Sequence, residues 1–239
     1  MAIPQYHLRR CSRGTSNVTR PTLPIRLAIL VDPKSNQLGV GPLAVEQLLG
    51  IWLGSPVVLG HQQDGTVLIT GASGHHAALG HASGVTAVAL ASRPVGLHLA
   101  SVPLKSADRH ANLQRIQPHE RSWLGTLPPE LREAALAQIV ALRQAVIGRD
   151  RSGWRGVSLP DLPDLLTPLL HRPAQPTLVW RPWAPLETGS SAPASPAGLV
   201  LAMPEPVLTR AGSHPAAIAQ LASPAGTLAL GVAWTANEA

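Results

Sequence analysis

The chain of 239 residues is short of aromatic and thiol side chains. It has no Phe, one Tyr and one Cys, whereas hydrophobic residues make up 45%. The core must therefore be built mainly from Leu, Val, Ile and Ala, with the six Trp filling the wider gaps. A single cysteine excludes an intrachain disulfide and a zinc site made of several thiolates, and it is compatible with a reducing compartment.

Long apolar runs are also missing. No segment approaches the about 20 consecutive apolar residues that a membrane helix needs. The first 22 residues carry Arg9, Arg10, Arg13 and Arg20 without any acidic residue, so they do not follow the pattern of a secretory signal. We expect a basic flexible arm over residues 1–22, no membrane partner and a cytoplasmic location.

Charged residues are few and unbalanced. They make up 13% of the chain, with 19 basic against 13 acidic side chains and a formal charge of +6. Only Lys34 and Lys105 are lysines, so the surplus consists of arginine. The guanidinium group binds phosphates and carboxylates through a planar fork, which suits an anionic partner. A compositional bias that leaves the arginines simply solvated explains the same numbers.

The apolar pattern predicts an α+β protein. The clearest helix is expected over residues 129–147, where an apolar residue recurs every three or four positions and Gly148 ends the pattern. Glu120, Glu130 and Glu133 are expected on a solvated helix face. A second helix is expected at 42–53 and a short one within 159–176. Strands are expected at 23–31, 57–59, 66–69, 85–90, 95–102, 178–183, 198–203 and 227–234.

Several motifs of well-known enzymes are absent from the sequence. It contains no Gly-Lys-Ser/Thr of a P-loop and no G-x-G-x-x-G fingerprint between a strand and a helix. It also lacks the Gly-x-Ser-x-Gly elbow of α/β-hydrolases. Nucleotide binding by these two loops and serine hydrolysis at such an elbow are therefore not predicted.

Two glycine-containing segments follow one another at a definite spacing. Residues 79–84 read Leu-Gly-His-Ala-Ser-Gly, and residues 93–100 read Arg-Pro-Val-Gly-Leu-His-Leu-Ala. They resemble the Leu-Ser-His-Ser-Gly and Pro-x-Gly-x-Asp-x-Glu motifs of the two-lobed phosphopantetheinyl transferases, and the fifteen residues from His81 to Gly96 equal the family's interval. Segments 118–124 and 140–145 are similar to two later helical motifs of the family. The resemblance covers residues 57–160.

The resemblance implies a fold and an activity. The fold is α+β, with two pseudo-symmetric lobes that each pack a small sheet on a long helix; we place the N-terminal lobe at 23–103 and the C-terminal lobe at 104–239. The implied activity is transfer of phosphopantetheine from coenzyme A to an acyl carrier protein, as in fatty acid or polyketide biosynthesis. The implied cofactor and partner are therefore coenzyme A and an acidic carrier protein.

The positions of the family's magnesium ligands have changed. The three residues that match its carboxylates are His98, Ala100 and Gln144, and no acidic residue occurs between Asp64 and Asp108. Mg²⁺ prefers anionic oxygen ligands, so neither magnesium nor any other metal is expected here. His98 and Gln144 are the candidate catalytic residues. The chain is therefore similar to a transferase whose metal site has degenerated.

The residues that remain favour binding over transfer. The resemblance implies that the motif histidine contacts a phosphate of coenzyme A, and a turn flanked by glycine is expected to offer backbone N–H groups to an anion. The arginines are expected to add charge-assisted hydrogen bonds. The candidate cofactor-binding residues are His81, Ser83, Gly84, Arg93, Arg143 and Arg149.

Three hypotheses stay open at this point. The first is a protein that binds coenzyme A or a carrier protein, or both, without magnesium-dependent transfer. The second is an enzyme that acts on a coenzyme A or carrier-bound thioester through His98 and His81. The third is a structural subunit whose basic surface docks an acidic partner. Nucleic acid is not an expected partner. Convergence of His75, His76, His81 and His98 on a transition metal is a less favoured alternative.

Overall fold

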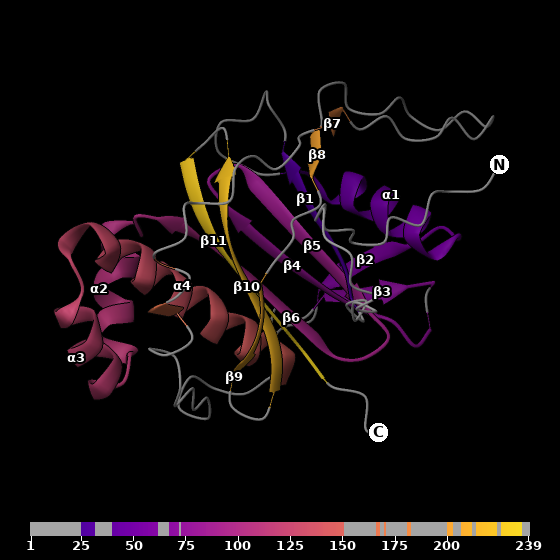
Figure 1. The fold of residues 1–239 in the computed structure, drawn as a ribbon. Coiled ribbons are helices and arrows are strands. Elements are labelled where there is room, and N and C mark those ends of the chain that lie inside the picture. The colour runs from indigo at the N-terminus through magenta and orange to yellow at the C-terminus, as the bar shows by residue number, and fades with distance from the viewer. Residues whose placement is uncertain are drawn as a thin grey trace, which may run out of the picture.

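The fold is α+β and contains two antiparallel sheets that pack face to face (Figure 1). The computed structural model describes residues 25–31, 40–61, 67–71, 73–150, 166–167, 170, 181–182, 200–202, 207–211, 214–223 and 226–235. In these residues no helix is both long and apolar enough to cross a membrane. The expected arm over 1–22 lies outside the described residues, as does most of the short helix expected within 159–176.

The first sheet has the strand order β4-β5-β1-β8-β7 and is accompanied by one helix and a separate hairpin of β2 and β3. The helix begins after Gly41 with Pro42, whose fixed φ suits a first turn, and ends at Gly54 in the left-handed conformation. The elements are β1 (Ile25–Val31), α1 (Pro42–Leu53), β2 (Val58–His61), β3 (Val67–Thr70), β4 (His76–Ala82), β5 (Val85–Ala91), β7 (Arg181–Pro182) and β8 (Val200–Ala202).

The second sheet has the order β6-β11-β10-β9, and helix α4 packs on it, with α2 and α3 before α4 in the sequence. A capping box formed by Gln117 and Glu120 starts the middle helix. The elements are β6 (Val95–Val102), α2 (Ser106–Arg115), α3 (Pro118–Thr126), α4 (Pro129–Asp150), β9 (Val207–Ala211), β10 (His214–Ser223) and β11 (Gly226–Trp234).

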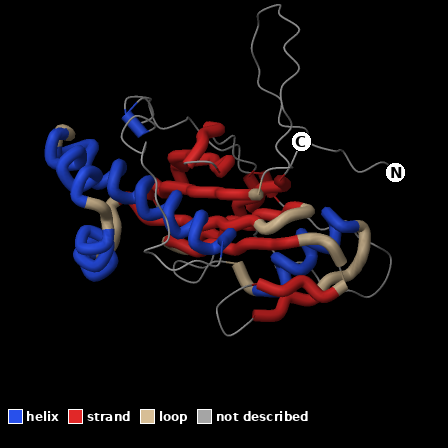
Figure 2. Tube along the Cα trace, turned by 90° about the horizontal axis from the view of Figure 1, so that it is seen from below, coloured by secondary structure: helices blue, strands red, loops and turns tan. Residues whose placement is uncertain are grey.

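Successive side chains along each strand point to opposite faces of its sheet, so the apolar clusters show what each face packs against. In β6, Leu97 and Leu99 belong to the apolar cluster between the two sheets, whereas Ala100 belongs to the cluster that contains α4. In β5, Ala87 and Ala89 lie between the sheets, and the even-numbered apolar residues face α1. The result is four layers, with α4 outside one sheet and α1 with the β2–β3 hairpin outside the other (Figure 2).

Helix α4 approaches the second sheet very closely. A Cβ added at Gly96 would lie 1.8 Å from the carbonyl oxygen of Ala145, and one at Gly231 would lie 2.4 Å from that of Ala141. The two glycines therefore let the helix backbone rest directly on β6 and β11. This contact also explains why the predicted end at Gly148 is wrong. Gly148 packs against Gly96 of β6. This contact with the sheet stabilises the helical conformation beyond Gly148, and the helix continues to Asp150.

Most of the predicted elements in the described part of the chain are confirmed, and three groups were missed. The helix at 42–53 and the strands at 23–31, 85–90, 95–102 and 227–234 are present. Strand β4, helix α2 and strands β9 and β10 were not predicted. Each sheet also contains strands from both sides of residue 103, the expected boundary between the lobes. In the first sheet β8 pairs with β1, and in the second β6 pairs with β11.

Candidate functional site

The two motif segments meet where the β4–β5 hairpin contacts β6. Ser83 and Gly84 form its two-residue turn, with positive φ values of 47° and 75° that match the twist of a tight hairpin. The hydroxyl groups of Ser83 and Ser101 are hydrogen-bonded at 2.8 Å. Gly80 lies against the backbone of β6, since a Cβ there would be 3.4 Å from Cα of His98. Segments separated by fifteen residues are thus adjacent in space.

His81 lies near the end of β4 and its side chain is exposed. The predicted turn therefore does not include His81, which is paired in the strand. It consists of Ser83 and Gly84. The imidazole Nδ1 is 2.9 Å from Oγ1 of Thr86, the residue opposite it on β5. The same oxygen accepts a hydrogen bond of 2.9 Å from the backbone N–H of Val40, just before α1. His81 is accordingly held on the α1 side of the first sheet.

His98 lies on β6 and faces α4, as do Gly96 and Ala100. Burial lowers the pKa of His98 from 6.5 to about 4, and the carboxylate of Asp108 opposes this shift only in part. The imidazole is therefore neutral at pH 7. Because a general base works best with a pKa near the operating pH, His98 is poorly matched to proton transfer at neutrality.

Of the three positions that match the family's metal ligands, two lie on the face of β6 that packs against α4 and the third lies on α4 itself. His98 and Ala100 point toward the helix, and half-buried Gln144 precedes Ala145, whose carbonyl group contacts Gly96. They supply an imidazole, a methyl group and an amide, which do not fit a Mg²⁺ ion. Within the described residues, no group of three or more His, Cys, Asp or Glu is arranged to hold a metal.

Arg143 and Glu120 form a buried ion pair, which corrects two expectations. The Arg143 Nη2 donates to Glu120 Oε1 at 2.5 Å, and the two side chains are 1% and 0% exposed. Burial lowers the pKa of Arg143, and the neighbouring Glu120 carboxylate opposes this. The other Glu120 oxygen accepts the N–H of Gln117 at the start of α3. Glu120 is thus not solvated, and Arg143 joins α3 to α4 instead of reaching an external phosphate.

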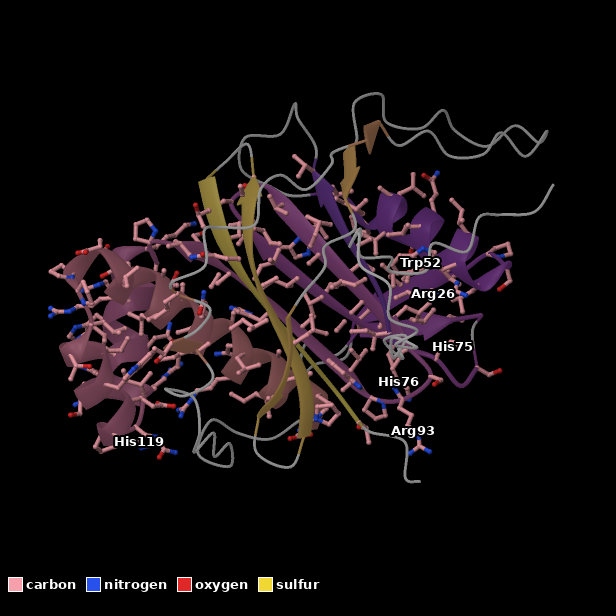
Figure 3. The ribbon with its side chains drawn as sticks, viewed as in Figure 1. Arg26, Trp52, His75, His76, Arg93 and His119 are labelled. Carbon is pink, nitrogen blue, oxygen red and sulfur yellow. The ribbon has the colours of Figure 1, made fainter. Side chains whose placement is uncertain are left out.

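The other two candidate arginines differ in exposure. Arg149 is buried, pairs with Asp150 at 2.5 Å and donates to the carbonyl oxygen of Trp234. Arg93 is exposed in the β5–β6 loop. Figure 3 shows it at the same end of the molecule as His75 and His76, and the register of β4 and β5 places His76 opposite Ala91, two residues before Arg93. Arg93 is therefore the one of the three that remains accessible.

The strand register directs the imidazoles of His81 and His98 to different layers. Gly80, next to His81, faces β6, so the side chain of His81 turns the other way, toward Thr86. His98 faces α4 on the far side of β6. The structure therefore brings the two backbones together but not the two rings, and it does not favour their joint action on one reacting atom.

Sequence reasoning missed Thr86 and Ser101, the partners of His81 and Ser83. Thr86 offered a signal, because it is the one polar residue in the apolar run Val-Thr-Ala-Val-Ala-Leu-Ala of β5. Comparisons with models of known protein families and with curated protein sequences gave no match. The function must therefore be argued from this chain's own residues.

Proposed function

We propose that the protein is a divergent relative of the two-lobed phosphopantetheinyl transferases that binds coenzyme A, an acidic acyl carrier protein, or both, without magnesium-dependent transfer. The observation that carries the proposal is the contact of the β4–β5 hairpin with β6, through the packing of Gly80 against His98 and the hydrogen bond of Ser83 with Ser101. It joins the two segments that resemble the family's motifs, as a shared ligand site requires.

The connectivity of the two sheets supports the proposed lobes. In the first half the strands follow the order β4-β5-β1, and in the second β10-β11-β6. In each half the first strand pairs with the last one, and the helix that packs on the sheet follows the first strand. A repeated unit of this kind is what a pseudo-symmetric, two-lobed protein would have, with the second unit beginning at Val95.

Binding accounts for the site better than a new catalytic centre does. Binding requires only one of the two histidines to contact the ligand, and His81 is the exposed one. A single reacting atom cannot contact both rings. The absence of carboxylates at positions 98, 100 and 144 removes the charge that holds Mg²⁺. We therefore favour a binding protein over an enzyme, and we propose a cytoplasmic location for it.

Thermal unfolding with coenzyme A tests the proposal. Coenzyme A in millimolar excess is expected to raise the Tm of the wild type, equally with and without Mg²⁺, because a ligand that binds only the folded state stabilises it. His81→Gln should abolish the increase. His119→Gln is the matched control, since His119 is an exposed histidine on α3 that takes no part in the contact of His81 with Thr86. An unchanged wild-type Tm in both conditions would contradict coenzyme A binding.

A second experiment addresses transfer and the protein partner. The wild type is incubated with coenzyme A, Mg²⁺ and an apo acyl carrier protein, and the carrier is weighed by mass spectrometry. No added phosphopantetheine is expected, whereas a complex with the carrier should be detected at low salt and weaken as salt screens the charges. A modified carrier would show that transfer persists and would overturn that part of the proposal.

A further inference from the structure

The hydroxyl group of Thr86 connects the chain before α1 to the ring of His81. Thr86 is 0% exposed, and in the part of the chain that the structure describes its Oγ1 has two hydrogen-bond partners. One is the backbone N–H of Val40 and the other is Nδ1 of His81, each at 2.9 Å. A polar group in this position is unusual, since the other six residues of β5 are apolar.

The donors and acceptors of this network determine which nitrogen of the His81 imidazole carries the hydrogen. The Val40 N–H can only donate, so Oγ1 accepts there. The hydroxyl proton of Thr86 must then go to His81, because a buried O–H without an acceptor is costly. Nδ1 of His81 is therefore the acceptor and carries no hydrogen. In a neutral imidazole the hydrogen then resides on Nε2.

We infer that Thr86 is a positioning residue that holds His81 in the Nε2–H tautomer with the ring at a definite angle. Nε2 then carries the hydrogen of the neutral ring, on a side chain that is exposed. This step rests only on the contacts of Val40, Thr86 and His81. Its consequence for a ligand rests on the proposed function: the donor suits an oxygen acceptor such as a phosphate of coenzyme A, and it requires no positive charge on the ring.

The tautomer is tested in the free protein by nitrogen NMR. The protein is labelled with ¹⁵N-histidine and measured near pH 8, where an ordinary histidine with a pKa of about 6.5 is neutral. His81 is assigned by the signals lost in His81→Gln. We expect Nδ1 to be unprotonated and Nε2 protonated, with no second tautomer. A His81 ring protonated at Nδ1 would overturn the inference whatever the protein binds.

Two substitutions separate positioning from stability. Thr86→Ser keeps the hydroxyl and is expected to keep the single tautomer. Thr86→Val removes it, so a population with Nδ1–H should appear and the Tm should fall, because the Val40 N–H loses its acceptor. An unchanged His81 spectrum in Thr86→Val would overturn the inference. Val88→Ala is the stability control, since it removes buried apolar volume from the same strand and leaves every hydrogen-bonding group of this network in place.

Coenzyme A affinity gives the second readout, measured by calorimetry below the Tm of every variant. Thr86→Val is expected to weaken binding by about three- to tenfold, the range for partial loss of a hydrogen bond to a charged group. Thr86→Ser and Val88→Ala should bind as the wild type does. Equal affinity of Thr86→Val and wild type would overturn the link to the ligand. If the wild type shows the Nε2–H tautomer but binds no coenzyme A, the proposed function fails and the tautomer assignment stands.

Discussion

The two halves of the molecule share a strand order but hold their helices differently. Helix α1 packs on the first sheet through side chains such as Leu48 and Leu49, whereas α4 rests on the second sheet almost backbone to backbone at Gly96 and Gly231. The first half therefore leaves an exposed His81 at its outer face. In the second half His98 is half-buried and faces α4. Under the proposed function, contact with a ligand would therefore come mainly from the first half, whereas the close packing of α4 makes the second half the more rigid one.

The largest effect is expected from filling the contact between β6 and α4. Gly96→Val would place side-chain atoms where the backbone of Ala145 and Arg149 already lies, and we expect a loss of about 4 kcal/mol or more in the free energy of unfolding. Urea unfolding followed by circular dichroism measures it. Gly41→Ser before α1 is the control from the first half, because a Cβ there meets nothing within 4 Å. It should change stability by at most about 1 kcal/mol. Equal effects at the two sites would remove the contrast between the halves.

The buried ion pair gives the next largest effect. Glu120→Gln leaves the Arg143 guanidinium buried without its charge partner, and we expect a loss of about 3–5 kcal/mol. Replacing both residues, as in Glu120→Gln with Arg143→Met, should recover much of this loss. In the first half, Glu46 accepts the N–H of Leu59 at 2.8 Å. Glu46→Gln keeps an acceptor there and should cost under about 1 kcal/mol. A double variant no more stable than Glu120→Gln would argue against this account.

The buried imidazole of His98 predicts a smaller effect that depends on pH. The pKa of His98 is about 4 in the folded protein, against 6.5 for an unperturbed histidine. Between these values the unfolded chain binds more protons, so the stability of the folded state falls as the pH drops from about 6.5 toward 4. His98→Gln should remove roughly 2–3 kcal/mol of that fall. Urea unfolding of both proteins near pH 7 and near pH 4 measures the difference, and parallel behaviour would contradict the burial of His98.

Local signals predicted the elements whose ends are marked by special residues. Helix α1 begins at Pro42 and stops at Gly54, and the pattern alone predicted both ends. Strand β4 was missed because Gly80 and the alanines at positions 77, 78 and 82 have low strand propensity, and it forms through its register with β5. Strand β10 was missed for a similar reason, since its Ala-rich sequence favours helix, yet neighbours on both sides supply its hydrogen bonds.

The candidate site was predicted in part. The sequence indicated that His81 and the β6 segment belong together, and their contact through Ser83 and Ser101 is present. It assigned Arg143 to a ligand and Glu120 to solvent, and both expectations were wrong. Nothing in the local pattern reveals that two charged residues on neighbouring helices, 23 positions apart, satisfy one another in the interior.

By itself, the sequence determined the α+β class, the ends of several elements and the absence of carboxylates at positions 98, 100 and 144. These properties depend on residue type and on short-range periodicity. Only the tertiary structure decided which charges are buried together, which face each histidine occupies and which hydroxyl group holds His81. Those outcomes depend on the register of strands far apart in the chain and on the packing of helices against a sheet. In such an interior an unpaired polar group is destabilising, which favours arrangements that give a buried polar group a hydrogen-bond partner.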